Sequence, residues 1–227
     1  MENAVEYKVS GRRALFSDPI SKIGGEKFTY PIPTYQALKG ITESIYWRPT
    51  IIWYIDKVRI VKTIRNESVN VRPIGYGGGN TLSIYTYLAD VEYQVKAHFE
   101  WNVNRPDLEP DRNENKHFFQ AKRMIDKGGR RDIFLGTREC QGYVVPCKFG
   151  EGEGAYDDVE SMPFSLMFHG FDYTDETGKD GMYARFWTPM MERGIIEFSK
   201  PEECGIRRFV RDYKPHFIKT QIFEEAE

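Results

Sequence analysis

Cysteines are few in this chain, and a long hydrophobic run is missing. Three cysteines occur among 227 residues, and no two of them form a CxxC pair. This usage argues against a disulfide framework or a zinc site and fits a reducing compartment. The longest apolar run, Ile51 to Ile55, is far too short to span a bilayer, and the first residues carry no apolar signal core. These absences predict a cytoplasmic protein with no membrane partner.

Motifs for metals and nucleotides are also missing. The four histidines show no HExxH or other metal-ligand spacing. Metal-assisted phosphoryl chemistry needs clustered carboxylates, whereas the densest acids here lie in a segment typical of loops and turns. The run Gly77, Gly78, Gly79 lacks the GxxxxGK pattern of a P-loop. We therefore expect neither a metal nor a cofactor. We interpret the glycines as a flexible loop or a bulge, with contact to RNA as the alternative.

The composition is that of a folded chain with unevenly placed charges. Apolar residues make up 40% and charged residues 29%, and the net charge is −2. Between residues 149 and 180, however, nine acidic residues stand against one lysine, so the rest of the chain is net basic. A polyanion responds to the local patch rather than to the total charge, which leaves nucleic acid open as a partner. The aromatic fraction of 15% suits either a sheet or stacking on single-stranded bases.

Hydrophobic periodicity predicts an α+β fold. The first helix is expected after Thr34, a good N-cap, because apolar residues recur at helical spacing from Leu38 to Ile45. Strands are expected over residues 5–9, 50–63 and 82–101, and a second helix over 112–131. A last strand is expected from two segments, residues 132–134 and 142–145. This order is the ferredoxin-like (RNA-recognition-type) arrangement. We expect two helices on one face of an antiparallel sheet and the other face free to receive a ligand.

The sequence changes character at residues 150–161, GEGEGAYDDVES, which are small, acidic and without periodicity. We interpret this stretch as a linker or surface loop after a ferredoxin-like domain over residues 1–149. Residues 162–227 are predicted to form a small antiparallel β-sheet domain with a basic tail. Its strands are expected over residues 164–171, 182–188 and 194–198.

The second predicted helix carries a lysine and a histidine, Lys116 and His117, in its first turn. Asp111 or Asn113 can cap this helix, and a glycine pair can end it. The free N–H groups of the helix start attract a phosphate and, with the neighbouring ammonium, disfavour adding a proton to imidazole. A neutral base beside a fixed cation suits cleavage of a phosphodiester by its own 2'-hydroxyl. The ordinary alternative is a surface Lys-His pair on a capped helix.

Other candidates for RNA contact surround this helix and the first one. Tyr46 is either a core residue at the end of the first helix or, with Trp47 and Arg48, part of a trio that stacks a base and holds a phosphate. The strand over residues 50–63 is expected to expose Lys57, Arg59 and Lys62. The remaining predicted RNA-binding residues are Arg12, Arg13, Lys22, Lys27, Arg72, Gly77, Gly78, Gly79, Lys122, Arg123, Arg130 and Arg131.

Several long phrases are together specific for one family. RPIGYGGGNTLSIYTYLADVEYQVKAHFEWN, RPDLEPDRNENKHFFQAKRM and GGRRDIFLGTRECQGYV closely resemble the CRISPR-associated RAMP proteins of type I-C systems, the d-type (also called c-type or Dvulg) branch of the Cas-five family. The likeness covers nearly all of residues 5–147 and continues more loosely through HGFDYTDETG. The catalytic tyrosine and Lys-His pair of that family fall on Tyr46, Lys116 and His117.

The resemblance implies a metal-independent endoribonuclease that cuts precursor CRISPR RNA within each repeat. The implied products are a 2',3'-cyclic phosphate and a 5'-hydroxyl. The implied partners are the repeat hairpin, the mature 5' handle and the other subunits of the type I-C surveillance complex. We expect His117 to be the base and Tyr46 the orienting group or acid, while a non-catalytic RNA-binding or assembly subunit is the alternative. The nuclease interpretation requires Tyr46 near His117 and a His117 ring that is not turned into the interior.

Overall fold

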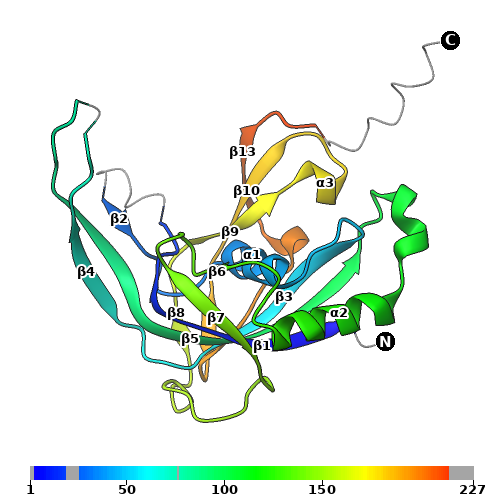
Figure 1. The fold of residues 1–227 in the computed structure, drawn as a ribbon, viewed down its shortest axis with the longest axis horizontal. Coiled ribbons are helices and arrows are strands. Elements are labelled where there is room, and N and C mark those ends of the chain that lie inside the picture. Colours follow the sequence, from blue (N-terminus) through cyan, green and yellow to red (C-terminus); the bar gives the residue numbers. More distant parts are fainter. Residues whose placement is uncertain (1–2, 19–25, 76, 215–227) are drawn as a thin grey trace.

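Two sheets organise the chain in the computed structural model (Figure 1), which describes residues 3–18, 26–75 and 77–214. The larger sheet has the strand order β6-β7-β1-β5-β3-β12-β11-β8, with β2 and β4 also paired to β5. The smaller sheet has the order β13-β10-β9. The predicted α+β fold class, with a large antiparallel sheet and a second small one, is confirmed.

The centre of the larger sheet is the predicted ferredoxin-like unit, β7-β1-β5-β3, in which all neighbours are antiparallel. Alternating apolar residues in these strands give one inward face. The strands are β1 (Ala4–Ala14), β3 (Ile51–Ile60), β5 (Ser83–Trp101) and β7 (Gln141–Pro146), and the helices are α1 (Tyr35–Ile45) and α2 (Glu114–Asp126).

Both helices cover the same face of this sheet. The Tyr7 hydroxyl of β1 meets the Thr42 hydroxyl of α1 at 2.8 Å. Tyr7 pairs with Val95 of β5, and Phe99, on the same side of that strand, contacts the ring of His117 in α2. The side chains of Thr34 and Asn113 cap the two helices, and both residues were among the predicted caps. None of the helices in the described ranges is long and apolar enough to cross a membrane.

The opposite face of the sheet is not free around Arg59 and Gln94, which corrects the expectation of an open ligand face. Arg59 is only 4% exposed, so the prediction that it lies at the surface is wrong. Its guanidinium donates to both carboxylate oxygens of Asp157 at 2.8 Å and to the carbonyl oxygens of Glu151 and Gly152. The acidic segment therefore lies across the sheet and is bonded to it.

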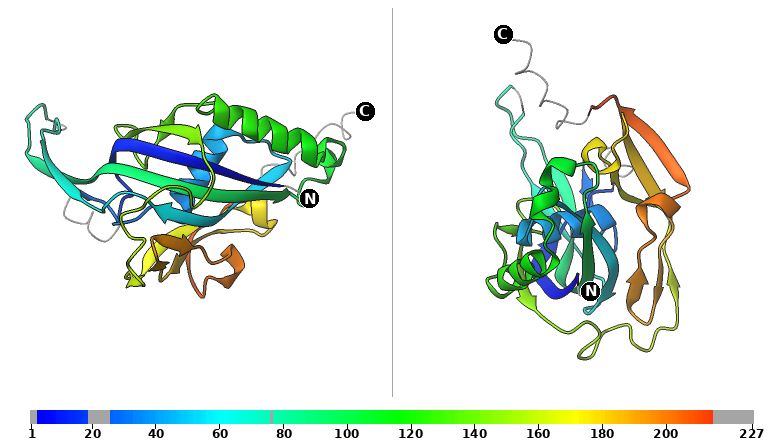
Figure 2. Two further views of the ribbon diagram at one scale, coloured as in Figure 1. Left: turned by 90° about the horizontal axis from the view of Figure 1, so that it is seen from below. Right: turned by 90° about the vertical axis from the view of Figure 1, so that its right-hand side faces the viewer.

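A long hairpin projects from the end of the sheet opposite the start of α2 (Figures 1 and 2). It consists of β4 (Asn66–Val71) and the first half of β5, and the short strand β2 (Lys27–Phe28) pairs beside it. Gly78 at its tip has φ +82°, a conformation that glycine adopts without strain, and its N–H bonds to the carbonyl of Gly75 at 2.9 Å. The glycine run is thus a hairpin turn.

The C-terminal strands divide between the two sheets. Residues 194–198 were expected in the small sheet, but β12 (Ile195–Glu197) pairs with β3 and extends the large sheet instead. β12 is followed outward by β11 (Met190–Glu192) and β8 (Met162–Pro163). The small sheet contains β9 (Met167–Asp172), β10 (Met182–Trp187) and β13 (Ile206–Arg211). The division into domains at residues 150–161 stays a prediction.

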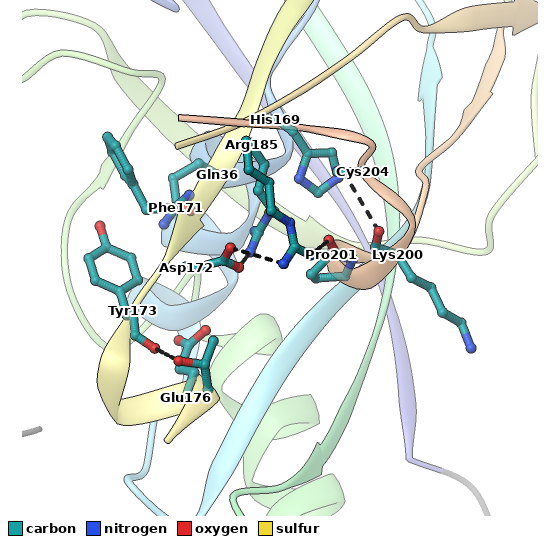
Figure 3. A network of polar contacts seen from close by, with 12 residues as sticks. Gln36, His169, Phe171, Asp172, Tyr173, Glu176, Arg185, Lys200, Pro201 and Cys204 are labelled. Carbon is teal, nitrogen blue, oxygen red and sulfur yellow. Dashed lines mark hydrogen bonds and ion pairs between the residues drawn. The ribbon is translucent and has the colours of Figure 1, made fainter. Parts of the chain in front are cut away.

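The remaining short elements are β6 (Ile133–Phe134), α3 (Thr174–Thr177) and the 3-10 helices η2 (Pro106–Asp111) and η3 (Pro201–Glu203). The small sheet makes a polar contact with α1, because the backbone N–H of Phe171 in β9 donates to the side-chain oxygen of Gln36 at 3.1 Å (Figure 3). Arg185 pairs with Asp172, and the ring of His169 stacks on Tyr35 at 4.2 Å between centroids. Burial and the nearby Arg185 charge lower the pKa of His169 to about 3. His169 is thus a neutral structural residue of the second sheet.

Candidate active site

Tyr46 and His117 meet although 71 positions separate them. Tyr46 is the residue that ends α1, and His117 lies in the first turn of α2. The Tyr46 hydroxyl lies 2.8 Å from Nδ1 of His117. The ring of His117 also packs against Phe99 and Trp101 at the end of β5. The first geometric requirement of the nuclease interpretation, a tyrosine beside the histidine, is met.

Hydrogen bonding defines the tautomer of a neutral His117. Its Nε2 lies 2.9 Å from the backbone carbonyl oxygen of Asp111. A carbonyl can only accept, so Nε2 carries the hydrogen. In the neutral ring Nδ1 is then an acceptor, and the Tyr46 hydroxyl donates to it. A proton can therefore reach Nδ1, the unprotonated nitrogen of His117, only by way of the Tyr46 hydroxyl.

Lys116 is connected to His117 through the carboxylate of Asp111. Its Nζ pairs with Oδ1 of Asp111, and the Thr50 hydroxyl donates to Oδ2 of Asp111 at 2.7 Å. Oδ2 also lies 3.4 Å from Nε2 of His117. Lys116, His117 and Tyr46 thus form one contiguous network, with the Asp111 side chain at its solvent side and Thr50 beneath it.

The second geometric requirement is not met. His117 is 0% exposed and Tyr46 is 3% exposed, so both rings are turned into the interior. Both ring nitrogens of His117 are occupied by protein atoms. The expectation of a histidine open to substrate is wrong for this conformation, because Asp111 and the aromatic residues of β5 cover the ring.

The electrostatics of the network follow from burial and from Lys116. Burial raises the pKa of Tyr46 above its usual range, and the nearby charges of Arg48 and Lys116 oppose that shift. Hydrogen bonds from Lys116 and Thr50 lower the pKa of Asp111. Asp111 is therefore an anion at neutral pH, and it balances the charge of Lys116.

Several predicted RNA-binding residues flank the network. Trp47 is 41% exposed and follows Tyr46 directly, and Arg48 next to it is exposed. The turn after α2 is bonded to the end of α1, because the backbone N–H groups of residues 130 and 131 donate to the carbonyls of Ile45 and Ser44. The four predicted RNA-binding side chains on and after α2 are all exposed: Lys122, Arg123, Arg130 and Arg131.

The other predicted residues that the structure describes lie on or beside the hairpin of β4 and β5, because Arg13 is opposite Ala89, Lys27 is opposite Tyr85 and Arg72 directly follows β4. Arg13 forms a bidentate pair with Glu67 of β4, and Lys27 pairs with Glu139 at 3.3 Å. Their charges are therefore already balanced within the protein. The remaining members of this group, Arg12, Arg72, Gly77, Gly78 and Gly79, are exposed, and Lys22 lies outside the described residues.

Two residues of the network were not identified as functional from the sequence. Thr50 belongs to no recognisable sequence motif. Its contact with the network appears only in the structure, where Thr50, directly before β3, donates to Asp111 at the end of η2. Asp111 was considered only as a possible helix cap, a role that Asn113 fills. Across residues 3–18, 26–75 and 77–214 we find no group of three or more His, Cys, Asp or Glu side chains placed to hold a metal ion.

Comparisons with known proteins agree with this fold. A family model described as CRISPR-associated protein (Cas_Cas5) matches residues 4–199. A solved structure of a CRISPR-associated protein is 36% identical, with a TM-score of 0.76 over 90% of this chain and 96% of that one. The fold and these matches define a CRISPR-associated protein. More particularly, the chain belongs to the Cas5d family.

Two curated relatives carry a more specific name. The CRISPR pre-crRNA endoribonuclease Cas5d of Mannheimia succiniciproducens is 27% identical over 87% of this chain and 95% of its own length. The protein of the same name from Thermus thermophilus is 29% identical over 72% of this chain and 73% of its own length. The similarity therefore extends over nearly the whole of the first relative.

Proposed function

We propose that this chain is an endoribonuclease that cuts precursor CRISPR RNA within its repeats. The observation that carries the proposal is the contact between Tyr46 and His117, with Lys116 beside them, in a chain of the Cas5d family. The names of the two curated relatives support the same activity. A lysine, a phenol and an imidazole are sufficient for metal-independent cleavage by the ribose 2'-hydroxyl.

Proton transfer passes through Tyr46 in this proposal. Tyr46 takes the proton of the 2'-hydroxyl while its own proton moves to Nδ1 of His117. The 2'-oxygen attacks phosphorus, and the bond to the 5'-oxygen breaks. The 5'-oxygen receives a proton from water or from the Tyr46 hydroxyl, which then recovers its proton from Nδ1 of the imidazolium. Lys116 stabilises the charge that builds on the non-bridging oxygens. The products are a 2',3'-cyclic phosphate and a 5'-hydroxyl.

This transfer through Tyr46 replaces the simpler role expected for His117, in which the imidazole removes the proton of the ribose 2'-hydroxyl directly. It follows from the tautomer, since the nitrogen that can accept a proton faces Tyr46 and not solvent. Substrate binding has to uncover the Tyr46 hydroxyl. The turn η2 covers the site through Asp111, which lies against His117. It contains no buried residue, so moving it disrupts little packing.

A second candidate function is a non-catalytic RNA-binding or assembly subunit. The complete burial of His117 is the observation that favours it. In both cases we propose that the protein stays with the 5' handle and joins the other subunits of the type I-C surveillance complex. The exposed basic residues of α2 and the hairpin are the proposed contacts with RNA.

Cleavage of a repeat hairpin by the purified protein tests the proposal. We expect cutting in excess chelator, and we expect none when the ribose at the cut site is 2'-deoxy. Tyr46→Phe and His117→Ala should each reduce the rate by at least about 100-fold while the RNA dissociation constant changes little. Tyr143→Phe is the matched control, because Tyr143 is 63% exposed on β7. Cutting of the deoxy RNA contradicts the mechanism, and binding without cutting by the unmodified protein leaves only the second function.

A further inference from the structure

Three groups of the candidate site surround one carboxylate, that of Asp111. Lys116 Nζ pairs with Oδ1, and the Thr50 hydroxyl donates to Oδ2 at 2.7 Å. Nε2 of His117 lies 3.4 Å from Oδ2; its hydrogen goes to the backbone carbonyl of Asp111 at 2.9 Å, so it becomes free for another acceptor when Asp111 moves. Thr50 is only 1% exposed, so its hydroxyl is fixed inside the protein with its donor direction toward the carboxylate. An ammonium, a hydroxyl and an imidazole N–H around two anionic oxygens are also the donors that hold a phosphate.

We infer that the scissile phosphate of the RNA takes the position of the Asp111 carboxylate, and that Thr50 is a ligand of that phosphate. This inference rests on the proposed function, since it concerns the same site. A phosphate and a carboxylate repel each other at this range, so Asp111 has to leave when RNA binds. Asp111 is therefore a built-in competitor of the substrate.

The elements that hold the four groups differ in how firmly they are anchored. Thr50 precedes β3, and its carbonyl accepts from the N–H of Asn102 at 2.8 Å. His117 belongs to the buried face of α2. Asp111, in contrast, ends η2, in which no residue is buried, and its side chain is one-third exposed. Thr50 and His117 thus remain in place while the competing anion can turn away into solvent.

Removal of the Asp111 charge tests the competition. The probe is repeat RNA with a 2'-deoxy ribose at the cut site, so that binding is measured without turnover. Asp111→Asn should lower its dissociation constant about 2- to 5-fold at low salt, because Lys116 no longer has to exchange a carboxylate for a phosphate. The matched control is Asp107→Asn in the same turn, whose carboxylate pairs with Arg105 and touches none of the site. Binding by Asp111→Asn that is no tighter than binding by Asp107→Asn overturns the inference.

The role of Thr50 is tested in the Asp111→Asn background. There Thr50→Val should weaken binding about 3- to 10-fold, and Thr50→Ser should restore it, because only the hydroxyl is needed. Thermal melting of each variant shows whether the fold is intact, and the serine variant keeps the test valid if the valine variant does not fold. Unchanged binding by the valine variant would mean that Thr50 serves only to anchor Asp111, which overturns its assignment as a phosphate ligand.

Failure of this inference is distinguishable from failure of the proposed function. The binding measurements do not depend on cutting, whereas the nuclease proposal is judged on cleavage by the unmodified protein. A protein that never cuts but shows the Asp111 and Thr50 effects has a phosphate site without the nuclease. A protein that cuts but shows neither effect is a nuclease whose phosphate is held elsewhere.

Discussion

At the scale of single residues, two completely buried histidines have different environments. Both nitrogens of His117 have partners, Tyr46 on one side and a carbonyl on the other, so the ring is connected to a second titratable group. His169 donates from Nε2 to the carbonyl of Ser199, while its Nδ1 has no partner. A ring held in this way can stay neutral but cannot pass a proton on. Burial alone therefore does not distinguish a structural histidine from a catalytic one.

The buried His169 makes stability depend on acid. The unfolded chain binds a proton near pH 6.5, whereas the pKa of His169 in the folded protein is about 3, so the free energy of unfolding falls as the pH is lowered from about 6.5 toward 3. At pH 5 the loss from this residue is about 2 kcal/mol. His169→Phe should flatten the pH dependence of urea unfolding between pH 6.5 and 5. An unchanged slope would contradict the assignment of a neutral buried ring.

The matched control has the opposite sign. A hydrogen bond from His98 to Asp56 raises the pKa of His98, so this residue stabilises the fold below its unfolded pKa and loses that contribution as the pH rises through the folded value. His98→Gln should therefore make the protein more sensitive to acid, not less. Parallel urea titrations of the two variants separate the two histidines.

At the scale of elements, the start of α2 sets the position of the site. The side chain of Asn113 accepts from the N–H of Lys116 at 3.0 Å, and its carbonyl accepts from the N–H of His117. The cap thus fixes the first helical turn, from which both candidate catalytic side chains extend. The end of α1 supplies Tyr46 from the opposite direction, through a helix that stops where Pro49 and β3 follow.

Loss of the α2 cap is expected to affect both stability and cutting. Asn113→Ala removes the acceptor of the Lys116 N–H and should cost about 1 kcal/mol of unfolding free energy. The rate of repeat cleavage should fall together with it, since the first turn then frays around His117. Asn113→Asp keeps an acceptor and should retain both properties. Chemical denaturation and single-turnover cleavage measure the two effects, and an alanine variant equal to the unmodified protein in both would contradict this role.

At the scale of the whole molecule, Arg59 joins the sheet to the acidic segment. Its guanidinium reaches Asp157 and two backbone carbonyls of residues 151–152, while its neighbour across the sheet, Gln94, bonds to the same segment. The side chain of Asp157 is 41% exposed, so most of the desolvation cost falls on Arg59. The segment expected to be a loose linker is therefore held against the face opposite the helices.

Removal of the Arg59 guanidinium should release this segment. Arg59→Met breaks several hydrogen bonds, most of them to a carboxylate and carbonyls, and should cost about 2–4 kcal/mol of unfolding free energy. A protease specific for glutamate should then cut after Glu151 or Glu153 faster than in the unmodified protein. Lys57→Met is the control, because Lys57 forms only an exposed pair with Glu197 and should change stability by less than about 1 kcal/mol. Equal proteolysis of both variants would contradict the role of Arg59.

The sequence by itself determined the local elements and the family. Helix caps, helical spacing and strand alternation depend on residues only a few positions apart, which is why Thr34, Asn113 and the strands of the ferredoxin-like unit could be predicted. The resemblance also identified Tyr46, Lys116 and His117 together. Their contact in space could be expected from the family but not from the spacing of residues 46 and 117.

Only the tertiary structure decided how those residues are presented. The pairing of β12 with β3, the burial of Arg59 and the position of Asp111 over His117 each join groups that are distant in sequence, or depend on which neighbours cover them. No local pattern encodes such contacts, because a charged side chain looks the same in the sequence whether it faces solvent or a buried partner. For that reason the candidate catalytic residues could be named from the chain, whereas their closed state, with a carboxylate in the proposed position of the phosphate, could not.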